Sequence, residues 1–271
     1  MATITKITAQ KRPGRYNIFL DNQYAFSLRE KTIANFVLLK GKELSNSDIE
    51  EIQRFDTDAK ASELAARFLS YEPRTIYEVL QYLKKHEVSD ESAALAVQEL
   101  TELGYLNDQE YARLFIRNDL QVGTDGPNNL TRKLTQKGLD PDLIQSSLEE
   151  IDEDEFIQVG MRLVKSLTKK AGRLSEREIQ NKIRIKLINH GFSSSLADEV
   201  VGRFDLSLNE DEQLEALKKQ GIKAYKKFRN FDEREKYFKI KKYLFTHGFS
   251  SGEIDAFLNG EVINLDELSE Y

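Results

Sequence analysis

The residues best suited to metal binding or acid–base chemistry are three histidines. His86, His190 and His247 each stand where an amphipathic stretch breaks, and Lys137 fills the same position in one further copy of the pattern. These residues lie one repeat apart, so they are not expected to converge on one ion or one substrate. A cation in the last turn of a helix is stabilised by the free carbonyl groups there. The pattern therefore predicts residues that end helices, with neither a metal site nor a catalytic role.

Clustered carboxylates at 149–155 and 210–212 could also suggest metal binding or acid–base catalysis. Both clusters coincide with a capping pattern, Asp152-x-x-Glu155 and Asn209-x-x-Glu212, in which acidic side chains stabilise the start of a helix. The chain has no cysteine, phosphate-binding loop, EF-hand spacing, GxGxxG motif or nucleophile elbow. The sequence therefore predicts a protein that is not an enzyme and needs no cofactor.

Positive charge is concentrated in one part of the chain. Residues 156–243 hold 21 Lys and Arg against 12 Asp and Glu, while the rest holds 19 against 34 and the whole carries −6. A basic block in an acidic protein indicates a local anionic partner, and Tyr225, Phe228 and Tyr237 lie among the lysines as contacts to unstacked bases would require. Solvated lysine-rich faces and buried aromatic residues are the alternative interpretation. The candidate residues for binding a partner or DNA are Lys182, Arg184, Lys186, Lys223, Lys226, Lys227, Lys241 and Lys242.

A recurring helical pattern positions these residues. A leucine on an apolar stripe is followed after three residues by His or Lys, then a break, then an apolar residue; the leucines are Leu83, Leu134, Leu187 and Leu244. Their spacing of roughly 50 to 57 residues is typical of a repeat array. We expect a mainly α protein of three-helix repeats in an elongated, curved array. The expected boundaries are a linker helix and repeat 1 at 56–120, repeat 2 at 121–170, repeat 3 at 171–231, and a truncated repeat 4 with an acidic tail at 232–271. Breaker-rich segments at 121–129 and 169–174 are predicted hinges.

Residues 1–55 follow a different pattern. Two β-prone runs, 16–20 and 24–28, flank Asp21-Asn22-Gln23 and predict a hairpin within a small three-stranded antiparallel sheet. Two short helices are expected after it, the second capped by Ser45 and ending near Phe55, before a separate helix over 56–70. The sheet could pack against the first repeat or present a side that binds DNA or protein.

Composition limits the cellular setting. No run of 18 apolar residues and no signal-peptide core is present, and the absence of cysteine suits a reducing compartment. We expect a soluble, cytoplasmic protein. Nothing in the sequence demands a dimer, so a monomer is expected.

Several motifs, in order and at fitting distances, are similar to those of the RecX family of recombination regulators. They are Pro73-Arg74-Thr75, Gly104-Tyr105-Leu106-Asn107-Asp108 with Tyr111-Ala112, and Leu130–Leu134 leading to Lys137-Gly138-Leu139. The resemblance covers residues 60 to 258, and longer family members also carry an N-terminal β-rich extension and an extra repeat. Two departures are Asn107, where Asp is common, and Glu87, where the later copies have Gly.

The resemblance implies a regulator of the recombinase RecA. Such proteins bind the RecA–DNA filament along its groove, inhibit its ATPase and strand exchange, and so act in DNA repair and the SOS response; some also bind DNA directly. Two alternatives remain open: a single-stranded DNA-binding protein acting through basic repeats 3 and 4, and a helical scaffold for some other protein. Direct DNA binding should weaken steeply with salt.

Overall fold

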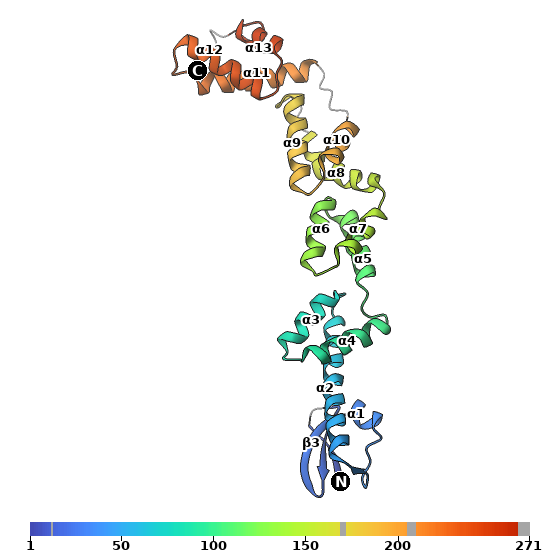
Figure 1. Cartoon of the computed structure of the whole chain (residues 1–271). Coiled ribbons are helices and arrows are strands. Elements are labelled where there is room, and N and C mark those ends of the chain that lie inside the picture. Colours follow the sequence, from blue (N-terminus) through green and yellow to red (C-terminus); the bar gives the residue numbers. More distant parts are fainter. Residues whose placement is uncertain (12, 169–171, 205–209, 265–271) are drawn as a thin grey trace. The chain divides into compact units, whose positions relative to one another are not determined.

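Helices dominate the chain, and one small antiparallel sheet lies at the N-terminus (Figure 1). The structure is a computed structural model that describes residues 1–11, 13–168, 172–204 and 210–264. It divides into two compact units: residues 1–114 with 134–144, and residues 115–133 with 145–271.

The N-terminal sheet has four strands. They are β1 (Ala2–Ala9), β2 (Arg15–Leu20), β3 (Gln23–Arg29) and β4 (Glu43–Leu44), in the order β3-β2-β1-β4, and all pairs are antiparallel. The predicted hairpin is confirmed: Asp21 and Asn22 have φ of 48° and 68°, the left-handed pair that a tight two-residue turn requires. The prediction of three strands missed β4, because a two-residue strand leaves no alternation to detect. Helix α1 (Glu30–Asn35) follows β3.

Helix α2 (Asn46–Leu69) runs without interruption through the position where two helices were expected. Its predicted cap at Ser45 is confirmed as a capping box with Asp48. Asp56, which the sequence suggested as a new helix start, is instead buried inside α2, where it accepts hydrogen bonds from the Arg29 backbone N–H at 2.6 Å and from the Thr32 hydroxyl at 2.8 Å. Asp56 therefore joins the sheet module to α2.

The first half of α2 completes the core of the sheet module, and its second half begins a three-helix bundle. Ile52 packs with Ile4, Ile18 and Leu28 of the sheet. Farther along α2, alanines pack against α3 (Ile76–Lys85) and α4 (Asp90–Glu102) around Leu83. The sheet module thus packs on the helix that also starts the first bundle. Helices α5 (Asp108–Val122), α6 (Pro127–Gln136) and α7 (Pro141–Glu149) come next in the chain.

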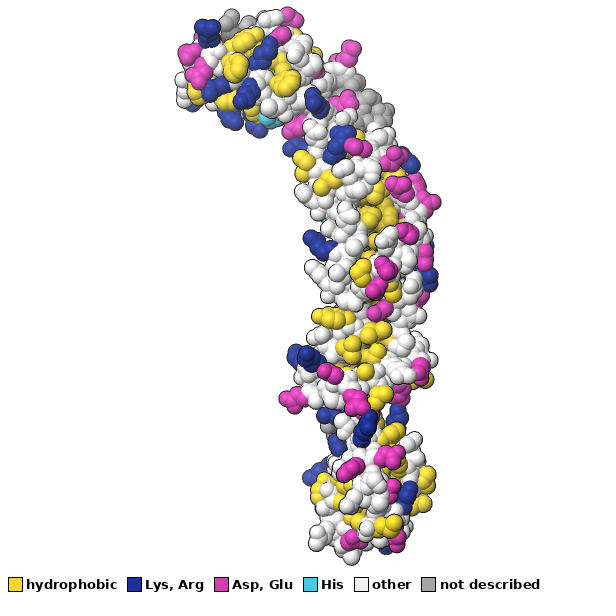
Figure 2. Space-filling model, viewed as in Figure 1, with side chains coloured by type: hydrophobic (Ala, Val, Ile, Leu, Met, Phe, Trp, Pro, Cys, Tyr) yellow, Lys and Arg dark blue, Asp and Glu magenta, His cyan; other side chains and the backbone are white. Residues whose placement is uncertain are grey.

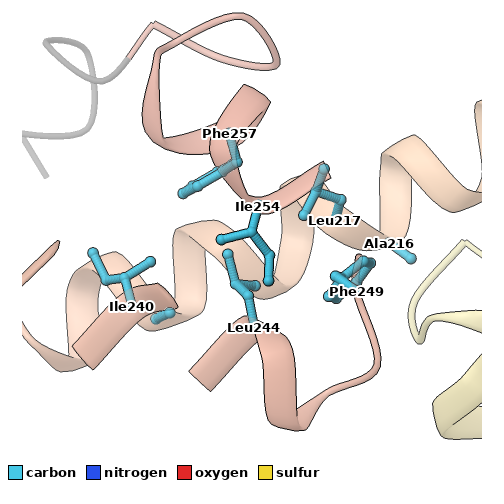
Figure 3. Packing of buried hydrophobic residues seen from close by; sticks show 8 residues of the cluster. Ala216, Leu217, Ile240, Leu244, Phe249, Ile254 and Phe257 are labelled. Atoms are coloured by element: carbon cyan, nitrogen blue, oxygen red, sulfur yellow. The ribbon is translucent and has the colours of Figure 1, made fainter. Parts of the chain in front are cut away.

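The second unit contains two further bundles. One is formed by α8 (Glu153–Thr168), α9 (Glu176–Asn189) and α10 (Ser194–Arg203). The other is formed by α11 (Glu210–Lys227), α12 (Glu233–Thr246) and α13 (Ser251–Leu258), around a core that includes Leu244, Phe249 and Phe257 (Figure 3).

Each of these bundles begins with its long helix. The expected boundaries placed that helix at the end of a repeat. In the structure each bundle therefore starts one helix earlier in the chain than expected. As a result the last bundle is complete with α11, whereas the sequence suggested a truncated repeat. The physical reason is that the apolar stripe of a helix shows that a core exists but not which neighbours complete it. The cap at Asn209 lies outside the described residues.

Candidate partner-binding surface

Helices α3, α6, α9 and α12, each the second of three helices in chain order, are called the middle helices. Within each unit, hydrogen bonds connect the start of one middle helix to the end of the next. The Thr75 hydroxyl, which caps the start of α3, donates to the carbonyl of Lys137 at the end of α6 at 2.7 Å. The Ser175 hydroxyl, which caps α9, donates to the carbonyl of His247 at the end of α12 at 2.5 Å. Between them, the backbone N–H of Gly126 donates to the carbonyl of His190 at the end of α9 at 2.8 Å. We call each of these contacts a junction; it satisfies a carbonyl that a helix end would otherwise leave free.

Glycine is required at the receiving side of each junction. Gly138, Gly191 and Gly248 have φ of 79°, 86° and 88°, in the left-handed region. A Cβ would lie 2.3 Å from the Tyr77 ring at Gly138, 2.5 Å from a backbone nitrogen at Gly191 and 2.7 Å from a hydroxyl at Gly248. These glycines therefore end their helices and also lie in contact with the neighbouring helix start.

The corresponding position in the first bundle is Glu87, which has φ of 58° and an exposed side chain. No helix start is seated against this position among the described residues. The departure from glycine noted in the sequence thus coincides with the one middle helix of the described structure whose end receives no junction.

Charged side chains reinforce the first junction. Lys137 donates from Nζ to Glu78 Oε1 at 2.8 Å and lies 5.4 Å from the centre of the Tyr111 ring. Burial acts to raise the pKa of Glu78, but the hydrogen bonds from Lys137 and from the Thr75 backbone outweigh it, so the pKa is lowered. The pKa of Lys137 is raised, because its interactions with Glu78 and Tyr111 outweigh the effect of its burial.

The segment 121–129, which the sequence indicated as a hinge, is held by several hydrogen bonds. Asp125 is only 8% exposed; its backbone N–H donates to Asp119 at 3.0 Å, and its carboxylate accepts from Asn129 at 3.1 Å and pairs with Lys133. Burial raises the pKa of Asp119, and the neighbouring carboxylate of Asp125 adds to this. The glycines and proline here shape the second junction. The other predicted hinge, 169–174, lies partly outside the described residues.

The histidines end helices, as predicted. His86, His190 and His247 are the C-terminal caps of α3, α9 and α12. Nδ1 lies 2.8 Å from the carbonyl of Tyr82 in His86 and 2.7 Å from that of Tyr243 in His247. In the parts of the chain that the structure describes, no group of His, Asp or Glu could hold a metal ion.

The candidate basic residues of α9 do not share one face. Lys182 pairs with Glu178 at 3.4 Å, and Lys186 donates to the carbonyl of Leu163 in α8 at 2.7 Å. Arg184 pairs with Asp198 in α10 at 2.5 Å. At about 100° per residue, Arg184 is turned roughly 200° from Lys182. Lys186 and Arg184 therefore tie α9 to the other helices of its bundle, and Lys182 is paired within α9 itself.

The candidate residues of α11 and α12 are more available. Lys227 lies 5.4 Å from the centre of the Tyr243 ring, and Lys241 pairs with Asp255 at 2.7 Å. Lys226 is exposed and also takes part in an interaction of its own. Lys223 and Lys242 are exposed and form no ion pair within the described residues. Figure 2 shows basic and hydrophobic side chains close together on the part of the surface that carries α12.

Two exposed aromatic residues of α12 were missed by the sequence reasoning. Phe238 is 69% exposed and Phe245 is 58% exposed, while Tyr225 and Phe228 pack partly buried against the core. Lys242 stands between the two phenylalanines at helical spacing, i+4 from the first. That spacing could have been noticed in the sequence. Because an aromatic residue on a helix is usually buried, only the structure could show that these two rings are exposed.

No helix within the described ranges is both long and apolar enough to cross a membrane.

Comparison with protein families gives four matches in chain order. The Regulatory protein RecX N-terminal domain matches residues 2–45, and the RecX first, second and third three-helix domains match 61–100, 107–148 and 210–258. These matches place each long helix first, as the packing does. The bundle α8–α10 lies between the second and the third.

Individual proteins give the same result over the full length. The chain is 55% identical over 271 residues to a Regulatory protein RecX of Lactobacillus gasseri, with all of both chains covered. It is 36% identical over 262 residues to that of Bacillus subtilis, covering 96% of this chain and 99% of the relative.

Solved structures agree. A crystal structure of regulatory protein RecX is similar with a TM-score of 0.65 and 31% identity, covering 75% of this chain and all of that one. A RecX structure from Lactobacillus salivarius gives a TM-score of 0.54 at 27% identity, covering 56% and 98%. The relatives are regulatory proteins, in agreement with the absence of enzyme motifs. The chain therefore belongs to the RecX family of regulatory proteins.

Proposed function

We propose that this chain binds the RecA filament on DNA and inhibits its ATPase and strand exchange, and so regulates recombination and the SOS response. The observation that carries the proposal is the full-length similarity to RecX regulatory proteins. The successive bundles support it, since several modest contacts on one chain strengthen each other through effective concentration. Because RecA works on intracellular DNA, we place the chain in the cytoplasm. The proposal also has the chain acting as a monomer.

The test is the ATPase rate of RecA on single-stranded DNA with substoichiometric amounts of this protein. Strong suppression is expected, with no hydrolysis by the protein alone. An unchanged rate over a range that saturates filament binding would overturn the inhibitory mechanism. An unchanged rate without any filament binding would overturn the proposal as a whole.

The candidate basic residues are not expected to contribute equally to partner binding. Lys223 and Lys242 are expected to contribute most, because they are exposed and form no ion pair within the described residues. The cations of α9 are engaged inside their own bundle. We therefore expect the last bundle to contribute more charge to partner binding than α8–α10.

A second candidate is direct binding of single-stranded DNA. The exposed Phe238 and Phe245 beside Lys242 favour it, since aromatic rings stack on bases while lysines neutralise phosphates. Binding of a labelled oligonucleotide without RecA, weakening steeply with salt, would support this function. A protein contact would instead require RecA to be present.

A further inference from the structure

A hollow of about 690 Å³ lies beside the middle of α2, between the sheet module and the first bundle. Figure 1 shows α2 running from one to the other. The α2 residues in its lining include Ala59 and Ala66, whose side chains are too small to fill the space. We call this hollow the notch; its charged and exposed apolar lining includes Arg15, Lys60, Glu63, Glu99, Leu103 and Tyr105.

Side-chain contacts hold the two walls of the notch in place. Lys31 of α1 donates from Nζ to Oε1 of Glu99 in α4 at 2.7 Å, and the hydroxyl of Ser62 in α2 donates to Oε2 of the same carboxylate at 2.5 Å. The whole lining also lies within one compact unit of the chain. The notch is therefore formed without a partner, and this lowers the entropic cost of binding one.

Most charges of the lining are paired. It contains five Lys and Arg against three Glu. Lys31 pairs with Glu99 at 2.7 Å. Arg29 and Arg67 pair with Glu63 at 3.1 Å and 2.9 Å. These five side chains therefore have partners inside the chain.

Two cations of the lining are left without a carboxylate. Arg15 and Lys60 form no ion pair within the described residues. The Nη2 of Arg15 donates to the hydroxyl of Ser27 at 2.9 Å, which is an uncharged partner. Lys60 is exposed on α2. The notch thus offers two positive charges to an outside carboxylate.

Large apolar side chains are exposed in the same lining. Leu103, at the end of α4, is 61% exposed, and Tyr105, two residues later, is 70% exposed. Exposed apolar side chains rimmed by charge are typical of interaction sites.

The unpaired cations and the apolar side chains together indicate an acidic peptide as the occupant. An extended peptide presents every second side chain to the surface on which it lies. Successive contacts can therefore be a carboxylate on Arg15 or Lys60 and an apolar side chain on Leu103 or Tyr105. A nucleic-acid strand fits less well, because the carboxylates of the lining repel a chain of phosphates.

We propose that the notch binds an extended, acidic peptide segment of a partner protein, one that also carries large apolar side chains. This contact goes beyond the proposed function and does not depend on filament binding. It requires the sheet module, because Arg15 lies in β2.

A random peptide library displayed on phage and selected on the immobilised full-length chain tests the chemistry of the occupant. The enriched sequences should share several Asp or Glu and at least one large apolar residue. Enrichment of sequences without carboxylates, or no enrichment, would overturn the proposal.

Fluorescence anisotropy with a labelled peptide of the enriched sequence tests the place. The double variant Lys60→Glu with Leu103→Ser should weaken binding about tenfold. The matched control, Lys85→Glu with Leu95→Ser, changes an exposed lysine and an exposed leucine of the same bundle outside the notch. It should weaken binding by less than about twofold, with circular dichroism showing that both variants fold. Equal losses in the two variants would place the peptide elsewhere and refute the notch as its site.

A measurement on the unchanged chain supports the comparison. The same peptide with every Asp and Glu replaced by Asn and Gln should bind at least about tenfold more weakly, since it cannot pair with Arg15 and Lys60. Equal binding of both peptides would contradict the role of charge.

Other occupants give different results. An oligodeoxythymidylate that displaces the peptide, and that binds the notch variant more weakly, would identify a nucleic-acid site. Self-association in light scattering that the notch variant abolishes would identify a second copy of this chain. Either result overturns the proposal. None of these assays contains RecA, so their outcome is separate from that of the RecA ATPase test.

Discussion

Gly191 ends α9 in a conformation and a place that no side chain suits. Its φ is 86°, and an added Cβ would lie 2.5 Å from the backbone nitrogen of Asn129. Gly104 ends α4 with a similar φ of 77°, but nothing lies within 4 Å of its added Cβ. Substitutions at Gly104 and Gly191 can therefore separate the destabilisation caused by backbone strain from that caused by loss of the junction.

We expect Gly104→Ala to lower the free energy of unfolding by about 1 kcal/mol, because an L-residue is strained in the left-handed region. Gly191→Ala should lower it by about 3 kcal/mol or more, since the junction must also move apart. Urea unfolding followed by circular dichroism measures both. Equal losses in the two variants would show that the contact at Gly191 contributes nothing.

The ion pair of Glu78 and Lys137 makes the first junction sensitive to pH. Because the pKa of Glu78 is lowered in the folded chain, its contribution to the free energy of unfolding is present above the unfolded pKa of 4.5. This contribution is lost as the pH falls through the folded pKa. The raised pKa of Lys137 means that its contribution is present below 10.5 and is lost as pH rises through the folded value.

Glu78→Gln should therefore reduce the free energy of unfolding at about pH 7, by about 1 kcal/mol, and should reduce it less below about pH 4. Urea titrations of wild type and variant at a series of pH values measure this difference. A difference that does not change with pH would mean that the carboxylate acts only as a neutral cap.

At the scale of elements, each bundle depends on a small core. In the last bundle, Phe257 of α13 is fully buried in the core (Figure 3). An added Cβ at Gly221 of α11 would lie 2.2 Å from its ring. The bare backbone of α11 thus gives the ring its place. The neighbouring bundle shows the same device, where a Cβ at Gly160 would lie 2.8 Å from Val200.

Phe257→Ala should lower the free energy of unfolding by about 3 to 5 kcal/mol, because it leaves a cavity in the core of the last bundle. Amide hydrogen exchange should rise in α11–α13 while that of α2–α4 stays unchanged, since the two bundles have separate cores. Phe245→Ala, at an exposed position, is the control and should change little. Uniformly faster exchange along the chain would contradict independent bundles.

At the scale of the whole molecule, charge is unevenly distributed, and this gives a prediction for partner binding. The double variant Lys223→Glu and Lys242→Glu should weaken binding to RecA filaments on DNA at low salt, because both lysines are exposed and form no ion pair within the described residues. The matched control, Lys84→Glu and Lys85→Glu, reverses two exposed charges at the end of α3.

Fluorescence anisotropy of labelled protein against salt concentration measures the effect. The control should bind as wild type does, and the difference between the variants should shrink as salt rises, because exposed charges are screened. If both double variants lose the same affinity, net charge rather than the last bundle determines binding.

The sequence by itself determined most of the elements and the family. Caps such as Ser45 and Thr75, the glycines that stop helices and the alternation of the first strands depend on neighbours a few residues apart, so local chemistry sufficed. The motifs from Pro73 to Leu139 pointed to RecX, and the comparisons confirmed it. The expected curved array and the partner-binding role of the basic residues stay predictions.

Only the tertiary structure decided which helices share a core and what joins the bundles. Periodicity shows that a helix has an apolar face, but α11 could have completed the bundle before it or the one after it. The hydroxyl of Thr75 caps its own helix and also reaches the carbonyl of Lys137, 62 residues away. Such a contact leaves no local pattern, because it joins two groups that each already have a local explanation.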